Sequence, residues 1–274
     1  MEDKSEPHSP GTRIRFGSDA FKKYLANTSW LFADRIIKLI LTLVVGIYLV
    51  RYLGPSDFGI LSYAISFVAL FATIATLGID SILTRELVKD PLSEPSLLGS
   101  SFVLRVIGAI AVLVLLAIAV LITRDDSETV TMIFILGGVT IFQSLFVVDF
   151  YFQAKVQAKF TVMVQSAVII TSSLIKLLLI YAQASLLSFV IITAMETVSI
   201  GIGFLIMYKA KGGRLFSWHF KKALAVRLLK DSWPLILSGI VVSIYSKIGQ
   251  IFIKNMLGNE ELGYYAAAVR RCES

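Results

Sequence analysis

The stretch RYLGPSDFG, Arg51 to Gly59, lies between two long apolar runs. It brings two glycines, a proline and two charged residues together within nine positions. Pro55 favours a turn, and Asp57 is of a residue type that caps a following helix. The glycines allow backbone angles that other residues avoid. The stretch therefore predicts a tight turn that joins two helices and reverses the chain.

The apolar runs on either side decide the class of protein. The chain has 274 residues, of which 56% are hydrophobic and 16% charged, with a mean hydropathy of +0.79. Soluble domains are about 45–50% apolar and about 25% charged. About twenty apolar residues in a helix span the ~30 Å hydrocarbon core, and a helix satisfies its backbone groups internally. We expect an all-α integral membrane protein with spans at residues 31–50, 58–79, 98–123, 129–151, 160–182, 185–208 and 233–257.

The distribution of Lys and Arg predicts the orientation. Sixteen of these residues lie in the N-terminal tail and the 80–97, 152–159 and 209–232 segments. The alternate segments hold three, namely Arg51, Arg124 and Lys254. We expect a multi-pass protein of the plasma membrane, and the positive-inside rule predicts that its N-terminus is cytoplasmic. A nucleic-acid partner is excluded because the chain has no soluble basic face.

A second copy of the opening motif follows at an offset of 204. Leu53-Gly54-x-x-Asp57-x-Gly59 aligns with Leu257-Gly258-x-x-Glu261-x-Gly263, and each copy follows a helix that a Ser-Trp pair precedes. Six predicted helices separate the copies, so the two copies run in the same direction. This predicts parallel repeats related by an axis along the membrane normal, with a cavity between two bundles. We expect a cytoplasmic tail, a six-helix lobe, a basic amphipathic cytoplasmic linker and the start of a truncated second lobe, at residues 1–29, 30–208, 209–232 and 233–274.

Two segments resemble a known family of transporters. VRYLGPSDFGILSYAISFVALFATIATLGIDSILTREL, residues 50–87, resembles the N-terminal signature of Wzx-like oligosaccharide flippases. These belong to the polysaccharide transporter family of the multidrug/oligosaccharidyl-lipid/polysaccharide exporter superfamily. MLGNEELGYYAAAVRRCES, residues 256–274, resembles the junction between the seventh and eighth helices of that family. Gly249 stands where many relatives carry Asp, so an ion-coupling role at this position is in doubt.

The resemblance, over residues 27–274, implies a fold and a function. Relatives have twelve to fourteen helices in two lobes and are transporters, not enzymes. The implied function is translocation of a lipid-linked oligosaccharide from the inner to the outer leaflet, by alternating access, in surface polysaccharide biosynthesis. The implied partners are a polyprenyl-diphosphate-linked oligosaccharide, membrane lipids, a polysaccharide polymerase and glycosyltransferases.

Ionisable residues within the predicted spans are the candidates for the substrate cavity, because charges at membrane depth are costly. Lys and Arg in a wet cavity would offset the charge of a diphosphate. Asp34 and Lys38 can pair along one helix face, and Arg35 and Lys38 can reach the headgroups. Glu196 and Lys247, both near mid-membrane, either form a salt bridge with each other or line a polar cavity. The candidates are Arg35, Lys38, Arg105, Lys176, Glu196 and Lys247.

The sequence offers little material for a cofactor site, and it leaves other functions open. Only His8, His219 and Cys272 offer histidine or cysteine chemistry, so no metal or organic cofactor is expected. Glu196 is a candidate for binding H⁺ or Na⁺ to couple transport. The alternatives are a drug or cation exporter of the same superfamily, a membrane enzyme, and an inactive fragment. We expect the acidic turn TRDDSET, residues 123–129, to be solvated and inert.

Overall fold

The computed structural model describes residues 18–123 and 125–272, and all regular structure in these ranges is helical. The predicted all-α fold class is therefore confirmed. Residues 1–17 of the predicted tail and Arg124 lie outside the described residues, whereas residues 18–29 begin the first helix. The α-helices are α1 (Ser18–Thr76), α2 (Asp80–Lys89), α3 (Glu94–Thr123), α4 (Ser127–Gly138), α5 (Thr140–Gln143), α6 (Val147–Ala154), α7 (Ala158–Tyr181), α8 (Leu186–Ala210), α9 (Lys222–Leu257) and α10 (Asn259–Cys272), and the 3-10 turns are η1 (Pro91–Ser93), η2 (Ser144–Phe146) and η3 (Leu215–Ser217).

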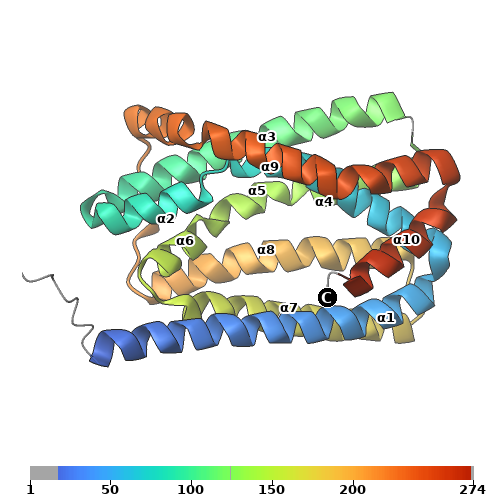
Figure 1. The fold of residues 1–274 in the computed structure, drawn as a ribbon, viewed down its shortest axis with the longest axis horizontal. Helices are drawn as coiled ribbons and strands as arrows, with labels where there is room; N and C mark the ends of the chain where they lie inside the picture. Colours follow the sequence, from blue (N-terminus) through green and yellow to red (C-terminus); the bar gives the residue numbers. More distant parts are fainter. Residues whose placement is uncertain (1–17, 124, 273–274) are drawn as a thin grey trace, which may run out of the picture.

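The long segments run along one common direction (Figure 1). Within the described ranges six of them are long and apolar enough to cross a membrane, and the first covers 65 residues. A helix of that length would be about 98 Å long at 1.5 Å per residue, three times the thickness of the hydrocarbon core. That segment must therefore turn back on itself.

The reversal in α1 lies at Gly54, where the opening motif predicts it. Gly54 has φ 71° and ψ 176°, which interrupts the helix and leaves Pro55 to start the second leg. Figure 1 shows the first leg of α1 in blue along one side and the second returning in lighter blue through the bundle. Spans 31–50 and 58–79 are therefore two passages, and α1 is a hairpin.

The span predicted over residues 129–151 is interrupted. α4 ends at Gly138, and α5, η2 and α6 continue in short pieces. The hydroxyl of Thr140 donates to the Gly137 carbonyl at 2.7 Å, and that of Ser144 donates to the Ile141 carbonyl at 2.6 Å. Side-chain bonds to carbonyls three residues earlier compete with the regular backbone ladder. The interruption frees a backbone carbonyl inside the bundle for another partner.

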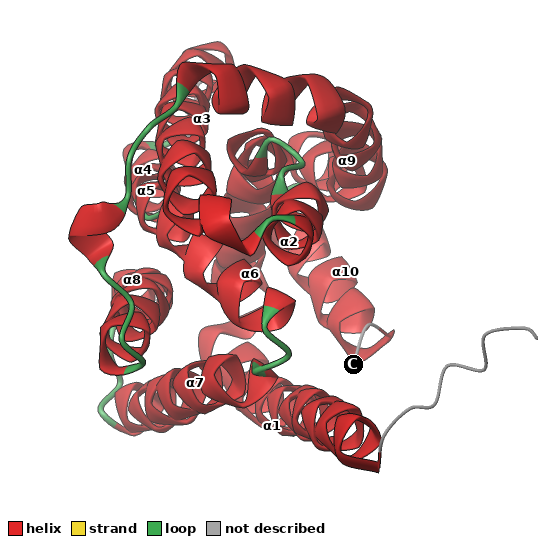
Figure 2. Ribbon diagram, turned by 90° about the vertical axis from the view of Figure 1, so that its left-hand side faces the viewer, coloured by secondary structure: helices red, strands yellow, loops and turns green. Residues whose placement is uncertain are grey.

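The basic segment before the last predicted span is the beginning of α9 and not a separate helix. Figure 2 shows that the first turns of α9 lie across the end of the bundle, inclined to the rest of the helix. Pro234 lies inside α9 and lacks the amide that a regular helix requires, which is a common cause of such bends. Leu228 and Ser232 are buried while Lys230 is exposed, so these turns are amphipathic. The domain boundaries themselves remain a prediction.

The two copies of the repeated motif contact each other reciprocally where α10 lies against the turn of α1. A Cβ on Gly59 would lie 1.9 Å from the carbonyl oxygen of Asn259, and a Cβ on Gly263 would lie 1.9 Å from that of Pro55. The offset of 204 relates Pro55 to Asn259 and Gly59 to Gly263. Gly258 also has a positive φ of 101° and a ψ of −177°, close to Gly54. Such a two-way contact between equivalent residues is the geometry of a local twofold axis.

Two apolar cores fill the described bundle. The first includes Ala75 and Ala109, and the second includes Ile79 and Leu104. Ala75 and Ile79 lie four residues apart where α1 ends and α2 begins, and Leu104 and Ala109 lie five residues apart on α3. The two cores therefore adjoin along these segments. Arg105, which is 5% exposed, lies at the junction of the two cores.

We predict that Gly59→Ala and Gly263→Ala lower the stability of the protein equally, by about 1–3 kcal/mol, because each added methyl overlaps a backbone carbonyl. Gly138→Ala is the matched control, since a Cβ there meets no atom within 4 Å. Thermal unfolding in detergent, followed by circular dichroism, measures the difference. Equal unfolding temperatures for all three variants would show that the two copies do not pack this closely.

Candidate functional site

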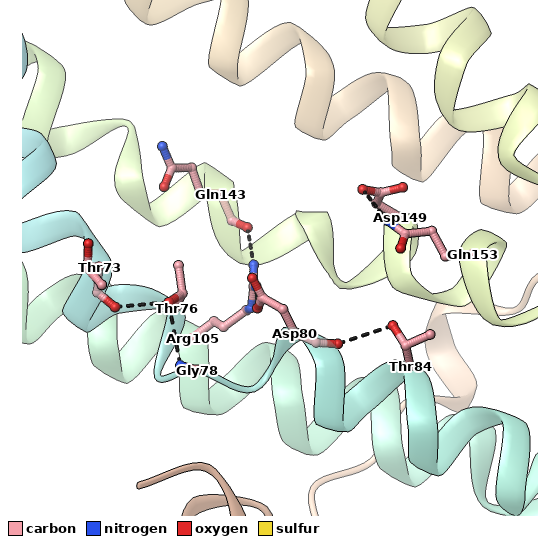
Figure 3. Close-up of polar contacts among 9 residues, drawn as sticks. All are labelled: Thr73, Thr76, Gly78, Asp80, Thr84, Arg105, Gln143, Asp149 and Gln153. Carbon is pink, nitrogen blue, oxygen red and sulfur yellow. Dashed lines mark hydrogen bonds and ion pairs between the residues drawn. The ribbon is translucent and has the colours of Figure 1, made fainter. Parts of the chain in front are cut away.

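Arg105 on α3 is the centre of a buried polar cluster (Figure 3). Its guanidinium forms an ion pair with Asp80 at the start of α2 and donates to the Gln143 carbonyl at 3.1 Å. The same group lies 5.1 Å from the ring centroid of Phe150. The Gln143 carbonyl is available because the helix is interrupted there. The Arg105 guanidinium thus supplies the hydrogen-bond donor that the Gln143 carbonyl lacks where α5 meets η2.

The turn between α1 and α2 positions Asp80. Leu77 and Gly78 both have positive φ, so the chain bends sharply before α2 begins. The Thr76 hydroxyl donates to the Thr73 carbonyl at 2.9 Å and accepts a long 3.5 Å bond from the Gly78 amide. The Asp80 side chain is 42% exposed, whereas that of Arg105 is 5% exposed. The pair therefore joins a buried cation to a carboxylate that retains access to solvent or ligand.

Asp149 on α6 belongs to the same region but forms no ion pair with any residue that the structure describes. Gln153 donates to one carboxylate oxygen at 3.1 Å, and the other oxygen is buried without a hydrogen-bond partner among the described residues. Figure 3 shows Asp149 beside Gln153 and apart from the Arg105–Asp80 pair. The sequence did not single out Asp149, although a carboxylate inside an apolar segment was a sufficient signal.

Lys38 and Arg35, adjacent on one turn of α1, have different surroundings. Lys38 donates to Asp34 at 2.6 Å, as predicted, and also contacts the side-chain oxygen of Gln165 on α7. The Ser166 hydroxyl lies 3.4 Å from the second Asp34 oxygen. Arg35 is exposed and makes no ion pair in the described part of the chain. Lys38 therefore ties α1 to α7, while Arg35 remains available.

Lys176 and Glu196 form an ion pair between α7 and α8. The ammonium lies 2.8 Å from a Glu196 oxygen, which also accepts a hydrogen bond from Ser172. The pair lines a cavity of about 140 Å³ together with α1 side chains such as Thr42. Of the two alternatives for Glu196, the salt bridge with Lys247 is wrong, because the Glu196 carboxylate pairs with Lys176 of the neighbouring helix and lines this cavity. An H⁺ or Na⁺ role for Glu196 stays a prediction.

Lys247 lies on the side of α9 that contacts the second leg of α1. On that side Thr73 donates to Ser243 at 3.0 Å, and Ser66 donates to Gln250 at 2.6 Å. Lys247 lies between these two contacts along the helix, is half-buried, and has no ion-pair partner within residues 18–123 and 125–272. Of the six candidates, Arg35 and Lys247 are thus the two that form no ion pair with a described residue.

The turn at residues 123–129 is not inert, contrary to expectation. The Asp125 carboxylate is 4% exposed, pairs with Lys254 of α9 and accepts a hydrogen bond from Tyr63 at 3.0 Å. Asp126 caps α4 by accepting from the Thr129 amide at 3.0 Å. Burial raises the pKa of Asp126, but the bonds from Thr129 outweigh it and the pKa lies below its usual value. The turn therefore connects α9 to the bundle formed by helices α1 to α8 (the first bundle).

Comparison with known proteins gives one match. A family model described as polysaccharide biosynthesis protein matches residues 24–271. No curated protein and no solved structure matches the chain.

We predict that Asp80→Asn destabilises the protein by about 1–3 kcal/mol, because it leaves the buried Arg105 without its counter-charge while Asp80 itself is partly solvated. Asp57→Asn is the matched control, since Asp57 is exposed and forms no ion pair with a described residue. It should change the stability by less than about 0.5 kcal/mol. Thermal unfolding in detergent compares the two variants. A small effect of Asp80→Asn would mean that Arg105 is neutralised in another way.

Proposed function

Because the chain belongs to the polysaccharide biosynthesis protein family, the family of Wzx-like polysaccharide and O-antigen flippases, we propose that it carries a lipid-linked oligosaccharide from the inner to the outer leaflet. Its apolar helices and its family indicate a multi-pass membrane protein. The observation that carries the proposal is the reciprocal contact of Gly59 with Asn259 and of Gly263 with Pro55. A twofold contact between repeats is the arrangement that two-lobe carriers use.

Alternating access requires a rigid lobe and an interface that can separate. Ion pairs hold the helices of the first bundle to one another, because Arg105–Asp80, Lys38–Asp34 and Lys176–Glu196 all form within it. The polar contacts of the second leg of α1 with α9 are instead hydroxyl and amide hydrogen bonds, which cost about 1 kcal/mol each to break. The first turns of α9 are held differently, by an ion pair between Arg227 and Glu86 of α2 at 3.1 Å. Motion is therefore easier at the α1–α9 interface than inside the bundle.

Two contacts hold the interface together at one end of the bundle. One is the glycine contact between the repeats, and the other is the buried Asp125–Lys254 pair, with the Lys254 ammonium 3.8 Å from the ring centroid of Tyr63. The positive-inside rule assigns this end to the outer face. In this proposal the Asp125–Lys254 pair closes the outer end, and opening there requires the pair to separate.

The proposed substrate is an anion that the unpaired cations could bind. A lipid-linked oligosaccharide carries a diphosphate, which needs cationic partners while its headgroup crosses the hydrocarbon region. Lys38, Lys176 and Arg105 are already paired with carboxylates. Lys247, half-buried at the interface and without such a partner, is the side chain best placed to meet a phosphate group there.

We predict that Lys247→Gln lowers the rate of translocation at least tenfold, since one charge-assisted contact is worth about 1.5–3 kcal/mol. The assay measures the arrival of a lipid-diphosphate oligosaccharide in the opposite leaflet of proteoliposomes, detected by an impermeant lectin. Lys230→Gln on the exposed start of α9 is the matched control and should leave the rate unchanged. Lys247→Arg should retain transport.

The transport assay separates two failures. Wild-type protein that moves no lipid-linked oligosaccharide would contradict the proposed function. Wild-type transport with an equally active Lys247→Gln variant would contradict only the role of Lys247.

The closed outer end has a separate test. Ser66 on the second leg of α1 is 3% exposed and donates to Gln250 of α9, so a cysteine there reports on opening of the α1–α9 interface. In a Cys272→Ser background, Asp125→Asn should speed labelling of Ser66→Cys by an impermeant thiol reagent by about tenfold or more. A loss of about 1.4 kcal/mol from the closed state is sufficient for this change. Asp57→Asn, at the same end and exposed, is the control, and equal rates in both variants would contradict the proposed closure.

A further inference from the structure

A separate cavity lies at the opposite end of the bundle from the glycine contact. It has a volume of about 340 Å³ and lies between the start of α1 and the loop that joins α6 to α7. Figure 1 shows these two segments at the end where α1 begins, away from α10. The cavity is lined by Ala26, Asn27, Trp30, Val156, Gln157, Lys159 and Phe160.

Two ammonium groups meet at one aromatic ring beside this cavity. The Nζ atoms of Lys159 and Lys211 lie 4.9 Å and 4.3 Å from the ring centroid of Phe160. Both lysines are exposed, and no carboxylate pairs with either of them among the residues described. Attraction to the electron-rich ring holds both cations close to Phe160, which lines the cavity. An anion in the cavity beside this ring would offset their charge.

The backbone at this cavity is also arranged for an anion. α7 begins at Ala158, and the N-terminus of a 24-residue helix carries a partial positive charge. The side-chain oxygen of Asn27 accepts a hydrogen bond from the Ala158 amide at 2.8 Å. Because that oxygen is occupied, the amide nitrogen of Asn27 is a donor available to a ligand.

The surface next to the cavity is apolar. Trp30 is 43% exposed, and its neighbours Leu31 and Phe32 are 46% and 68% exposed. A tryptophan near the end of a spanning helix is typical of the membrane interface. A ligand of this site thus has an anionic head in the cavity and an apolar chain along α1.

We propose that this cavity binds the phosphate headgroup of a membrane lipid at the end of the bundle where α1 begins. The two lysines and the start of α7 contact the phosphate, and Trp30 contacts the first part of the chain. The site lies outside the α1–α9 interface, so this inference does not depend on the proposed transport function. A bulk anionic phospholipid and a polyprenyl diphosphate share the required chemistry.

Trp30 makes the binding measurable. The protein is placed in phosphatidylcholine vesicles that contain increasing fractions of brominated phosphatidylglycerol, whose bromines quench nearby tryptophans. A Trp30→Phe variant identifies the part of the quenching that arises at the cavity. We expect Trp30 to be quenched at lower fractions of brominated phosphatidylglycerol than of brominated phosphatidylcholine.

Removing both charges should weaken the site. In Lys159→Gln/Lys211→Gln the half-quenching fraction of brominated phosphatidylglycerol should rise about 30-fold, because each lysine contributes about fivefold. Lys89→Gln/Lys230→Gln removes the same charge from exposed lysines elsewhere and should leave the curve unchanged. Lys159→Arg/Lys211→Arg keeps the charges and should keep the binding, which guards against a loss that reflects misfolding.

Competition identifies the source of the phosphate. Recovery of Trp30 fluorescence by non-brominated phosphatidylglycerol or by polyprenyl diphosphate supports the site, and the lipid effective at the lower fraction is its preferred occupant. Recovery by inorganic phosphate alone would overturn the assignment to a lipid. Equal quenching by brominated phosphatidylcholine, or an equal shift in the Lys89/Lys230 control, would overturn the site itself.

Discussion

The guanidinium of Arg105 lies between two apolar cores, where water cannot neutralise it. A charge at that depth is tolerated only if the protein supplies its partners, and Asp80 and the Gln143 carbonyl do so. Both partners require departures from regular helix. The turn before α2 delivers Asp80, and the interruption between α5 and η2 exposes the Gln143 carbonyl. The two irregularities thus supply the partners that the buried cation requires.

The need to pair buried charges also distinguishes the helices that ion pairs hold together from the interface that can bind a charged ligand. Lys38 and Lys176 are satisfied by carboxylates within the first bundle, so these charges hold helices together. Lys247 at the α1–α9 interface has no such partner within the described ranges. A group that the fold leaves unneutralised in a poorly hydrated place is available to a charged ligand. Function in this protein is therefore expected where the internal pairing of charges is incomplete.

The repeated glycine motif has two roles that depend on the absence of a side chain. Gly54 and Gly258 adopt positive φ and end their helices, which reverses the chain at corresponding places. Gly59 and Gly263 allow two backbones to approach so closely that no Cβ would fit. The first role is local and the second joins segments about two hundred residues apart. Both follow from the same short pattern, and together they give the twofold contact on which a two-lobe mechanism depends.

Local properties of the sequence determined the membrane class, the all-α fold, the reversal at Gly54, the pairing of Asp34 with Lys38 and the duplication. Each depends on hydrophobic run length, helical spacing or turn chemistry, which act over a few residues. Only the tertiary structure decided that Glu196 pairs with Lys176, that Asp125 is buried against Lys254, and that the helix after α4 is interrupted. Those outcomes depend on which helix lies beside which, and the apolar spans are too uniform in composition to specify their neighbours. The physical reason is that lipid-like side chains pack against many partners equally well, whereas a buried charge accepts very few.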